Sequence, residues 1–403
     1  MLDRIKRFLL CIYGFAFFDT LTLILPVNNL FMAANGMGPI LISIIIIAWS
    51  VGAIIGTVPA TRLACRMGIR NSLFLGQCLK ATAFVIFPLC PAFWGFTVAM
   101  IIWGMQSAIY NTVFESLVYD ELVANNRRNM YTHILAQRRN FRTVGLLLSA
   151  SGSFFMFLGY EWLTVLSIIS VLISMLFVMA MPISVKPHCT TVERGASITR
   201  GRIRSLLGVL VQTPKLLPAF IVCIIVAEFS YLDDYFNLIA TDIGVPLRWV
   251  GAVTFSMMLC TILGQAIAGR FTRISAGVLS LGLIISGGLY MLFVVCDNIW
   301  GLGLLALAYI MVSAIRVWLY SNMMDKIPSG DRLAILSLYN IGTQLTYFIV
   351  CLIIGIGGSM GRWGYGTFVL GVILCIVGIQ IMVFLHNMRS RRIVMPDNIS
   401  HVQ

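Results

Sequence analysis

The sequence has little charge for its length. Only 11% of its 403 residues are Asp, Glu, Lys or Arg, whereas 59% are hydrophobic and the mean hydropathy is +0.94. This composition excludes a soluble fold, because the core of a protein of this size cannot hide so much apolar surface.

Side chains that commonly carry out chemistry are also scarce. The chain has four histidines, and its ten cysteines include no CxxC pair. It contains no HExxH or GxSxG pattern and no cluster of His and Cys at metal-ligand spacing. Most cysteines lie in apolar stretches, where we expect free thiols. We therefore predict that the protein is not an enzyme and holds no cofactor and no metal.

Long apolar stretches take up most of the chain. A helix that crosses a bilayer needs roughly 20 apolar residues, and these stretches are uniformly apolar rather than alternating as barrel strands would be. We predict twelve spans, at 8–28, 39–60, 72–90, 94–116, 142–159, 162–182, 216–238, 249–269, 275–295, 299–321, 333–357 and 364–386.

The second half of the chain repeats the first at an offset of 208 residues. The pairs that show this are polar or small residues: Asn29 with Asn237, Gly36 with Gly244, Gly56 with Gly264 and Arg62 with Arg270. We therefore predict an all-α integral membrane protein of twelve transmembrane helices in two pseudo-symmetric six-helix halves. The halves would be residues 1–185 and 216–388, joined by a cytoplasmic linker at 186–215 and followed by a cytoplasmic tail at 389–403.

The basic residues indicate the orientation in the membrane. Most of the 28 Lys and Arg fall at the two ends of the chain and in alternate loops. Such loops face the cytoplasm, so both termini are predicted to be cytoplasmic. Topology and anionic lipid then account for the net charge of +13, and we expect no nucleic-acid partner.

Acidic residues inside the spans are the first candidates for function. A charged group at membrane depth costs at least about 2.5 kcal/mol, so its presence suggests a role. Asp19 lies near the middle of the first span, and Glu228 lies at a similar depth in the seventh. We predict that one of them couples transport to a proton; the alternative is that it only bonds to neighbouring helices. Asp233 and Asp234 lie further out on the seventh span, and we predict that they belong with Asp19, Glu228 and Arg316 to the proton-coupling or substrate cavity.

Two basic residues also fall inside predicted spans. Arg316, in the tenth span, could neutralise Glu228 or bind an anionic substrate; the alternative is that it extends to the cytoplasmic interface. For Lys80, near the cytoplasmic end of the third span, we expect that extension.

Two loop segments carry a family resemblance. Residues 58–70 resemble the signature loop of the major facilitator superfamily, with Leu63, Ala64, Arg66 and Gly68 matching and with Thr61 and Cys65 in place of its Gly and Asp. Residues 115–120 are similar to the Glu-Ala-x-x-Tyr-Asp segment of a bacterial branch. The resemblance implies a monomeric transporter of the bacterial inner membrane that works by alternating access. It also implies a cytoplasmic gate, for which we predict Arg62, Arg66, Gly68, Arg70, Glu115, Tyr119, Asp120 and Arg270.

Three functions remain open at this point. The first is secondary active, proton-coupled transport of a small organic solute, with the substrate, protons and the lipid bilayer as partners. The second is a drug/proton exporter of lipophilic compounds: the aromatic first span favours it, whereas the missing proline in the fifth span does not. The third is a non-transporting scaffold or receptor on the same fold.

Overall fold

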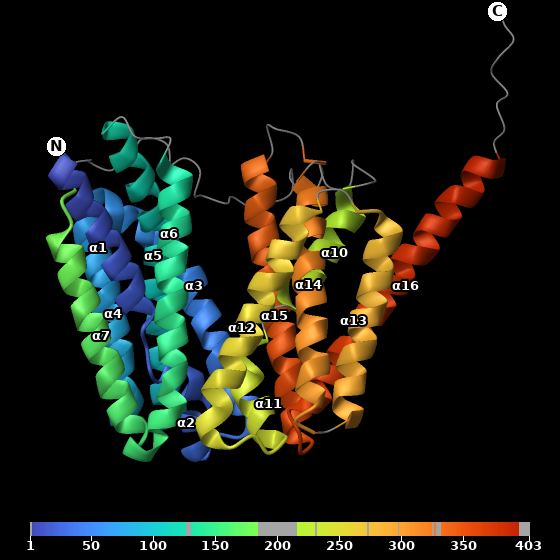
Figure 1. The fold of residues 1–403 in the computed structure, drawn as a ribbon, viewed down its shortest axis with the longest axis horizontal. Helices are drawn as coiled ribbons and strands as arrows, with labels where there is room; N and C mark the ends of the chain where they lie inside the picture. The colour runs from blue at the N-terminus through green and yellow to red at the C-terminus, as the bar shows by residue number, and fades with distance from the viewer. Residues whose placement is uncertain are drawn as a thin grey trace, which may run out of the picture. The chain divides into compact units, whose positions relative to one another are not determined.

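The structure is a computed structural model in which residues 2–125, 130–183, 216–229, 232–271, 274–296, 298–324, 326–327 and 332–394 are described. Within these ranges every regular element is a helix (Figure 1). The predicted linker at 186–215 lies outside them. The chain forms two compact units. Unit 1 comprises Met1–Arg202, Asp234–Thr241 and Val245–Phe255, and unit 2 comprises Ile203–Asp233, Asp242–Gly244 and Ser256–Gln403.

The helices follow one another through both units with short connections. In chain order they are α1 (Leu2–Thr20), η1 (Leu25–Val27), α2 (Asn28–Ala34), α3 (Pro39–Met67), α4 (Ile69–Leu89), α5 (Phe93–Ala124), α6 (Tyr131–Ala150), η3 (Ser151–Leu158), α7 (Tyr160–Ala180), α10 (Leu216–Glu228), η4 (Asp233–Tyr235), α11 (Phe236–Asp242), α12 (Leu247–Arg270), α13 (Ala276–Cys296), α14 (Gly301–Met324), α15 (Arg332–Ser359) and α16 (Gly364–Val394).

The helices confirm the prediction of a multi-span membrane protein. Among the described residues, eleven helical segments are long and apolar enough to cross a membrane. The seventh predicted span is divided between α10 and α11. The prediction for the fifth span was wrong at its start, because α6 begins at Tyr131 rather than at residue 142. Arg138 and Arg139, which we had placed in a loop, therefore lie on a membrane helix.

The first and seventh spans are interrupted at equivalent places. In the first, α1 ends at Thr20, η1 covers 25–27 and α2 begins at Asn28; in the seventh, α10 ends at Glu228, η4 covers 233–235 and α11 begins at Phe236. Each boundary lies 208 residues after its counterpart. The repeat found in the sequence is thus a repeat of the breaks themselves, as in transporters that build their sites from discontinuous helices.

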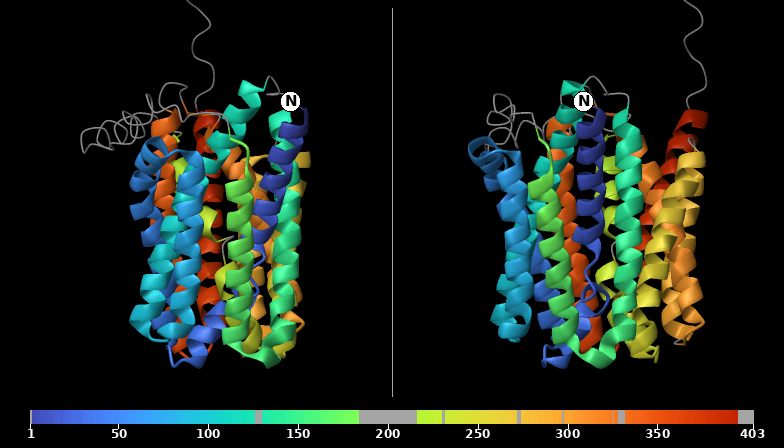
Figure 2. Two further views of the ribbon diagram at one scale, coloured as in Figure 1. Left: turned by 90° about the vertical axis from the view of Figure 1, so that its left-hand side faces the viewer. Right: turned by 60° about the vertical axis from the view of Figure 1, so that its left-hand side comes forward.

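Unit 1 is organised around α1, which packs between α6 and α7 (Figure 2). Next to them, α4 packs on α5 and α7, and α3 lies along α5. Glycine permits the α3–α5 contact: a Cβ at Gly52 would lie 2.1 Å from the carbonyl oxygen of Ile101, and one at Gly104 would lie 2.0 Å from that of Trp49. The backbones of the two helices therefore touch, as small residues allow in membranes.

In unit 2, α13 packs on α14 and α16, while α10 packs on α14 and α15. Glycines again permit a close approach, since a Cβ at Gly287 of α13 would lie 2.5 Å from the carbonyl oxygen of Gly371 on α16. The eight cysteines in the part of the chain that the structure describes are thiols and form no disulfide, as predicted.

The α3–α5 contact generates a stability prediction. Replacing Gly104 with Ala places a methyl group against the backbone of α3, and we expect this to destabilise the protein by about 1–3 kcal/mol despite the better helix propensity of alanine. The control is Gly288→Ala in α13, where no atom lies within 4 Å of the added Cβ. Thermal melting in detergent should show a lower Tm only for Gly104→Ala, and equal melting of the two variants would contradict the packing account.

Candidate functional site

A buried ion pair lies where the first span breaks. Asp19, the second-last residue of α1, is 8% exposed. The Lys80 ammonium on α4 lies 2.9 Å from its Oδ1 and also donates a 2.5 Å hydrogen bond to its backbone carbonyl. Gln77 Nε2 donates to the same Oδ1 at 3.0 Å, and Ser174 Oγ on α7 donates to Gln77 Oε1 at 3.1 Å. Three helices thus hold one carboxylate in its charged form.

The expectation that Lys80 extends to the cytoplasmic surface was therefore wrong. Its side chain is buried, and it lies within one turn of Gln77 on the face of α4 that meets α1. A buried lysine with a carboxylate and a helix carboxyl end as partners is far less costly than an isolated one. Depth along a span does not reveal such a partner on another helix.

Serine side chains form hydrogen bonds with the backbone groups that are left without helical partners where the first span is interrupted. Ser149 Oγ on α6 accepts from the Thr22 N–H at 2.7 Å and donates to the Thr20 carbonyl at 2.8 Å. On α7, Ser167 Oγ accepts from the Ile24 N–H at 3.0 Å, and Ser170 Oγ donates to the Phe18 carbonyl at 2.8 Å. In lipid these backbone groups have no water to bind, so the serines make the break possible. We did not single them out from the sequence, although Ser167, Ser170 and Ser174 share one helical face.

Glycines bring the serine-bearing helix close to the break. A Cβ at Gly145 would lie 2.6 Å from the carbonyl of Phe17, and one at Gly152 would lie 2.0 Å from that of Leu23. Thr20 Oγ1 also donates to the Arg142 carbonyl at 3.1 Å. The sequence of α6 is thus fitted to the broken segment of α1.

Two arginines on α6 lie near the same region. The Arg138 guanidinium carbon is 4.4 Å from the ring centroid of Phe114 and 5.3 Å from that of Tyr110, and its Nη2 donates to the Tyr110 hydroxyl at 2.8 Å. Arg142, one turn further along, acts electrostatically on Asp19 and on Tyr110. Among the described residues, no acidic oxygen lies within 4.0 Å of either arginine. The sequence analysis placed Arg138 in the loop before the fifth span and Arg142 at the first position of that span, and it singled out neither as a site residue.

Unit 2 carries the second acid at the equivalent break. Glu228 is the last residue of α10 and is 8% exposed. Arg316, half-buried on α14, acts on it electrostatically, and so does Asp233.

Where the seventh span is interrupted, tyrosine rather than serine side chains form hydrogen bonds with the backbone. The Tyr290 hydroxyl donates to the Phe229 carbonyl at 3.1 Å, and the Tyr309 hydroxyl accepts from the Leu232 N–H at 2.8 Å. No lysine takes the place of Lys80: α4 and α13 both have 21 residues, and the corresponding turn of α13 holds Gly287 and Gly288. Glu228 and Asp19 therefore lie at equivalent places in different electrostatic surroundings.

The remaining predicted site residues are dispersed. Asp233 is half-buried and Asp234 is exposed, both in η4.

The predicted gate residues begin with Gly68, which joins α3 to α4 with a φ of +82°, a conformation that favours glycine. Arg66 and Arg270 are exposed, and Arg70 Nη2 donates to the Met181 carbonyl at 2.6 Å. The side chains of Arg62, Glu115, Tyr119 and Asp120 lie outside the part of the chain that the structure describes.

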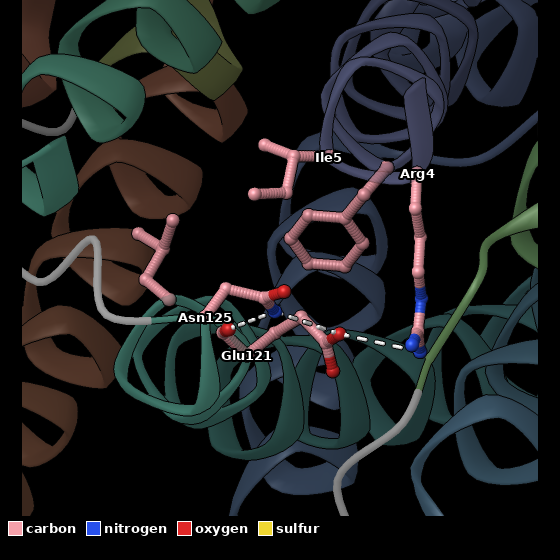
Figure 3. Close-up of a pocket in the computed structure, with 6 residues that line it drawn as sticks. Arg4, Ile5, Glu121 and Asn125 are labelled. Atoms are coloured by element: carbon pink, nitrogen blue, oxygen red, sulfur yellow. Dashed lines mark hydrogen bonds and ion pairs between the residues drawn. The ribbon is translucent and has the colours of Figure 1, made fainter. Parts of the chain in front are cut away.

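Another acid lies at the end of α5. Glu121 is 3% exposed, and its Oε1 lies 3.6 Å from Arg4 Nη2 and accepts from Asn125 Nδ2 at 3.3 Å (Figure 3). These residues line a small pocket with Ile5 and Phe8. The sequence pattern predicts Glu115, Tyr119 and Asp120, the last of which directly precedes Glu121, but nothing in the pattern marks Glu121 itself.

Comparisons with known proteins agree with this architecture. A family model described as Major Facilitator Superfamily matches residues 9–350. No curated protein matches the chain in sequence.

Solved transporters share the fold at low identity. A D-xylose-proton symporter is 14% identical, with 94% of this chain and 97% of that one covered and a TM-score of 0.68. The nucleoside transporter NupG is 12% identical, with 94% and 98% covered and a TM-score of 0.67. A peptide transporter POT in complex with sulfate is 11% identical, with 94% of each chain covered and a TM-score of 0.69.

The Asp19–Lys80 pair generates the prediction for this site. Lys80→Met leaves a buried carboxylate without its counter-ion, which costs about 3–5 kcal/mol, whereas combining it with Asp19→Asn removes both charges and restores most of the stability. Thermal melting of the single and double variants in detergent measures the coupling. Equal losses in Lys80→Met and in the double variant would show that the pair is not coupled.

Proposed function

This chain belongs to the Major Facilitator Superfamily, and from that membership we propose that it is a secondary transporter that moves a small organic anion together with protons. The protein is an integral membrane protein, and its helices and family support transport of a small molecule. The substrate class and the coupling ion are our proposals, and they are argued from the charges of each unit in turn.

The proposal of an anionic substrate rests on the charged residues near the break in the first span, where basic side chains outnumber acidic ones among the described residues. The acid there, Asp19, is already bound by Lys80, whereas Arg138 and Arg142 form no ion pair with any described residue. Positive charge at membrane depth is costly when it has no partner. A carboxylate or phosphate group on the substrate would supply the partner, and guanidinium binds such groups through two parallel hydrogen bonds.

The geometry of Arg138 supports the same reading. Its guanidinium plane lies against Phe114 and Tyr110, and the Tyr110 hydroxyl takes one of its five N–H donors. An aromatic surface fixes the orientation of the group while leaving donors for a ligand. The side chain is thus held in place before any substrate binds, which reduces the entropy cost of binding.

We assign proton coupling to Glu228 rather than to Asp19. The Lys80 ammonium lies 2.9 Å from Asp19 Oδ1, whereas the matching turn of α13, with Ser286, Gly287 and Gly288, brings no lysine to Glu228. A buried carboxylate without a lysine can take up and release a proton as its exposure to water changes. The D-xylose-proton symporter, which has a similar fold, is in keeping with this assignment.

The exporter of lipophilic cations is less well supported. The aromatic residues of α1 pack within the fold, with Tyr13 stacked on Phe141 at 5.0 Å and Phe18 on Phe177 at 5.7 Å. A cationic drug would also have to compete with Lys80 for Asp19.

The remaining predictions form part of the same proposal. We propose a monomer in a bacterial inner membrane with both termini in the cytoplasm. Arg62, Arg66, Gly68, Arg70, Glu115, Tyr119, Asp120 and Arg270 would form the cytoplasmic gate, with Asp233 and Asp234 at the other end of the seventh span.

Transport by liposomes containing the purified protein tests the substrate class. In counterflow against a panel of carboxylates, phosphate esters, neutral sugars and lipophilic cations, we expect exchange of anions only. Arg138→Gln should abolish it, whereas the adjacent, exposed Arg139→Gln should retain it. Exchange of cations, or equal activity of the two variants, would contradict the proposal, and no exchange of any compound would favour a scaffold.

Proton coupling is tested with Glu228→Gln. An amide cannot release a proton, so we expect this variant to keep anion counterflow but to lose accumulation driven by an imposed pH gradient. Glu161→Gln, at an exposed position at the start of α7, is the control. Normal accumulation by Glu228→Gln would remove Glu228 from the coupling mechanism.

A further inference from the structure

The charged groups near the break in the first span do not balance one another. Lys80 compensates Asp19, since its ammonium lies 2.9 Å from the Asp19 Oδ1. Arg138 and Arg142 remain, and both act electrostatically on Tyr110, as Asp19 does. The groups that act on Tyr110, together with Lys80, therefore carry two net positive charges. At membrane depth such an excess is costly unless anions compensate it.

The two uncompensated arginines share one face of α6. They are four residues apart, a spacing at which side chains on successive helix turns are neighbours. Arg139 follows Arg138 directly and therefore lies about 100° further round the helix. Arg138 is half-buried and Arg142 is exposed, and in the described part of the chain neither has an acidic oxygen within 4.0 Å. Both guanidinium groups can therefore contact one ligand.

Helix stability does not account for this pair. Like charges four residues apart on a helix repel one another and are destabilising. Asp19 is not a sufficient partner for Arg142, although the two interact electrostatically, because Lys80 already compensates its charge. A ligand that brings negative charge to both arginines would remove the repulsion between them.

The support for Arg138 is a feature of unit 1 and not of the repeated fold. Helices α5 and α14 begin 208 residues apart, so the counterpart of Tyr110 is Trp318. The Trp318 indole holds no arginine and instead donates to the carbonyls of Ala268 and Phe271 at the end of α12, at 3.1 and 2.8 Å. The fold thus tolerates another role at this position, which favours a ligand-related role for Tyr110 and its arginine.

We propose that Arg138 and Arg142 form a paired site for a substrate with two negative charges, a dicarboxylate or a phosphate monoester. This inference rests on the proposed function, which assigns an organic anion to Arg138 but leaves the charge of that anion open. Phe114 and Tyr110 orient Arg138 for the first negative charge, and Arg142 binds the second. Charge-assisted hydrogen bonds are about twice as strong as neutral ones, so Arg142 gives a dianion an advantage over a monoanion.

The test is counterflow in liposomes that contain the full-length protein, at slightly alkaline pH. Two pairs of probes differ by one negative charge each: succinate with monomethyl succinate, and propyl phosphate with methyl propyl phosphate. We expect half-maximal exchange of the dianion at a concentration at least about tenfold lower than that of its monoanion. A preference within one pair alone supports the site and identifies the anionic group as carboxylate or phosphate.

Variants of α6 separate the paired site from a structural role. Arg142→Gln should weaken dianion exchange at least about tenfold and leave monoanion exchange and the Tm as in the wild type. Arg142→Lys keeps the positive charge and should retain most of the preference. Arg139→Gln removes the same charge from another face of α6 and should behave as the wild type.

Three results would overturn the paired site. Equal half-maximal concentrations for dianions and monoanions would do so while leaving the proposed anion transport intact. Equal weakening of both by Arg142→Gln, with a lower Tm, would show that Arg142 only supports the fold. Loss of the preference in Arg139→Gln as well would assign it to the overall charge of α6. Absence of exchange for all four probes would overturn the proposed function together with this inference.

Discussion

The structure depends on how a helix can be interrupted inside a membrane. Without water, each freed N–H and C=O group must find a partner within the protein. In the first repeat serines on α6 and α7 supply it, and in the second repeat tyrosines on α13 and α14 do. The same breaks place an acid at the end of α1 and of α10, where the helix carboxyl end makes negative charge unfavourable unless a cation compensates. The function we propose follows from how each repeat meets that requirement.

The two repeats compensate the charge of their acids in different ways, and we base the different roles proposed for Asp19 and Glu228 on that difference. In the first, Lys80 binds both the carboxylate and the terminal carbonyl of α1, so Asp19 acts as a structural charge. In the second, Glu228 has Arg316 within electrostatic range but no lysine on α13. We propose on this basis that the first copy of the repeated acid stabilises the fold, whereas the second copy exchanges protons.

Part of this arrangement could be predicted from the sequence. Apolar length and the 208-residue repeat were enough for the helical membrane fold, because both depend on composition and spacing alone. The repeat also paired Asn29 with Asn237, although nothing in the sequence indicated the hydrogen bonds that their side chains make. The sequence did not predict which side chains on different helices contact one another. Lys80 was expected to extend to the surface, whereas its pairing with Asp19 depends on the rotation of α4 against α1. Arg138 was missed because a charged helix end looks like a loop when only hydropathy is considered, and Arg142 was missed because it stood at the edge of the predicted span.

The most direct test of the account is ligand binding to the purified protein, measured as thermal stabilisation against carboxylates, phosphate esters, neutral solutes and lipophilic cations at constant ionic strength. A ligand that binds the native state raises the Tm in proportion to the logarithm of its concentration above Kd. The account predicts that organic anions raise the Tm and that Arg138→Gln removes the shift while keeping the unliganded Tm within a few degrees. Stabilisation by lipophilic cations, unaffected by Arg138→Gln, would contradict it.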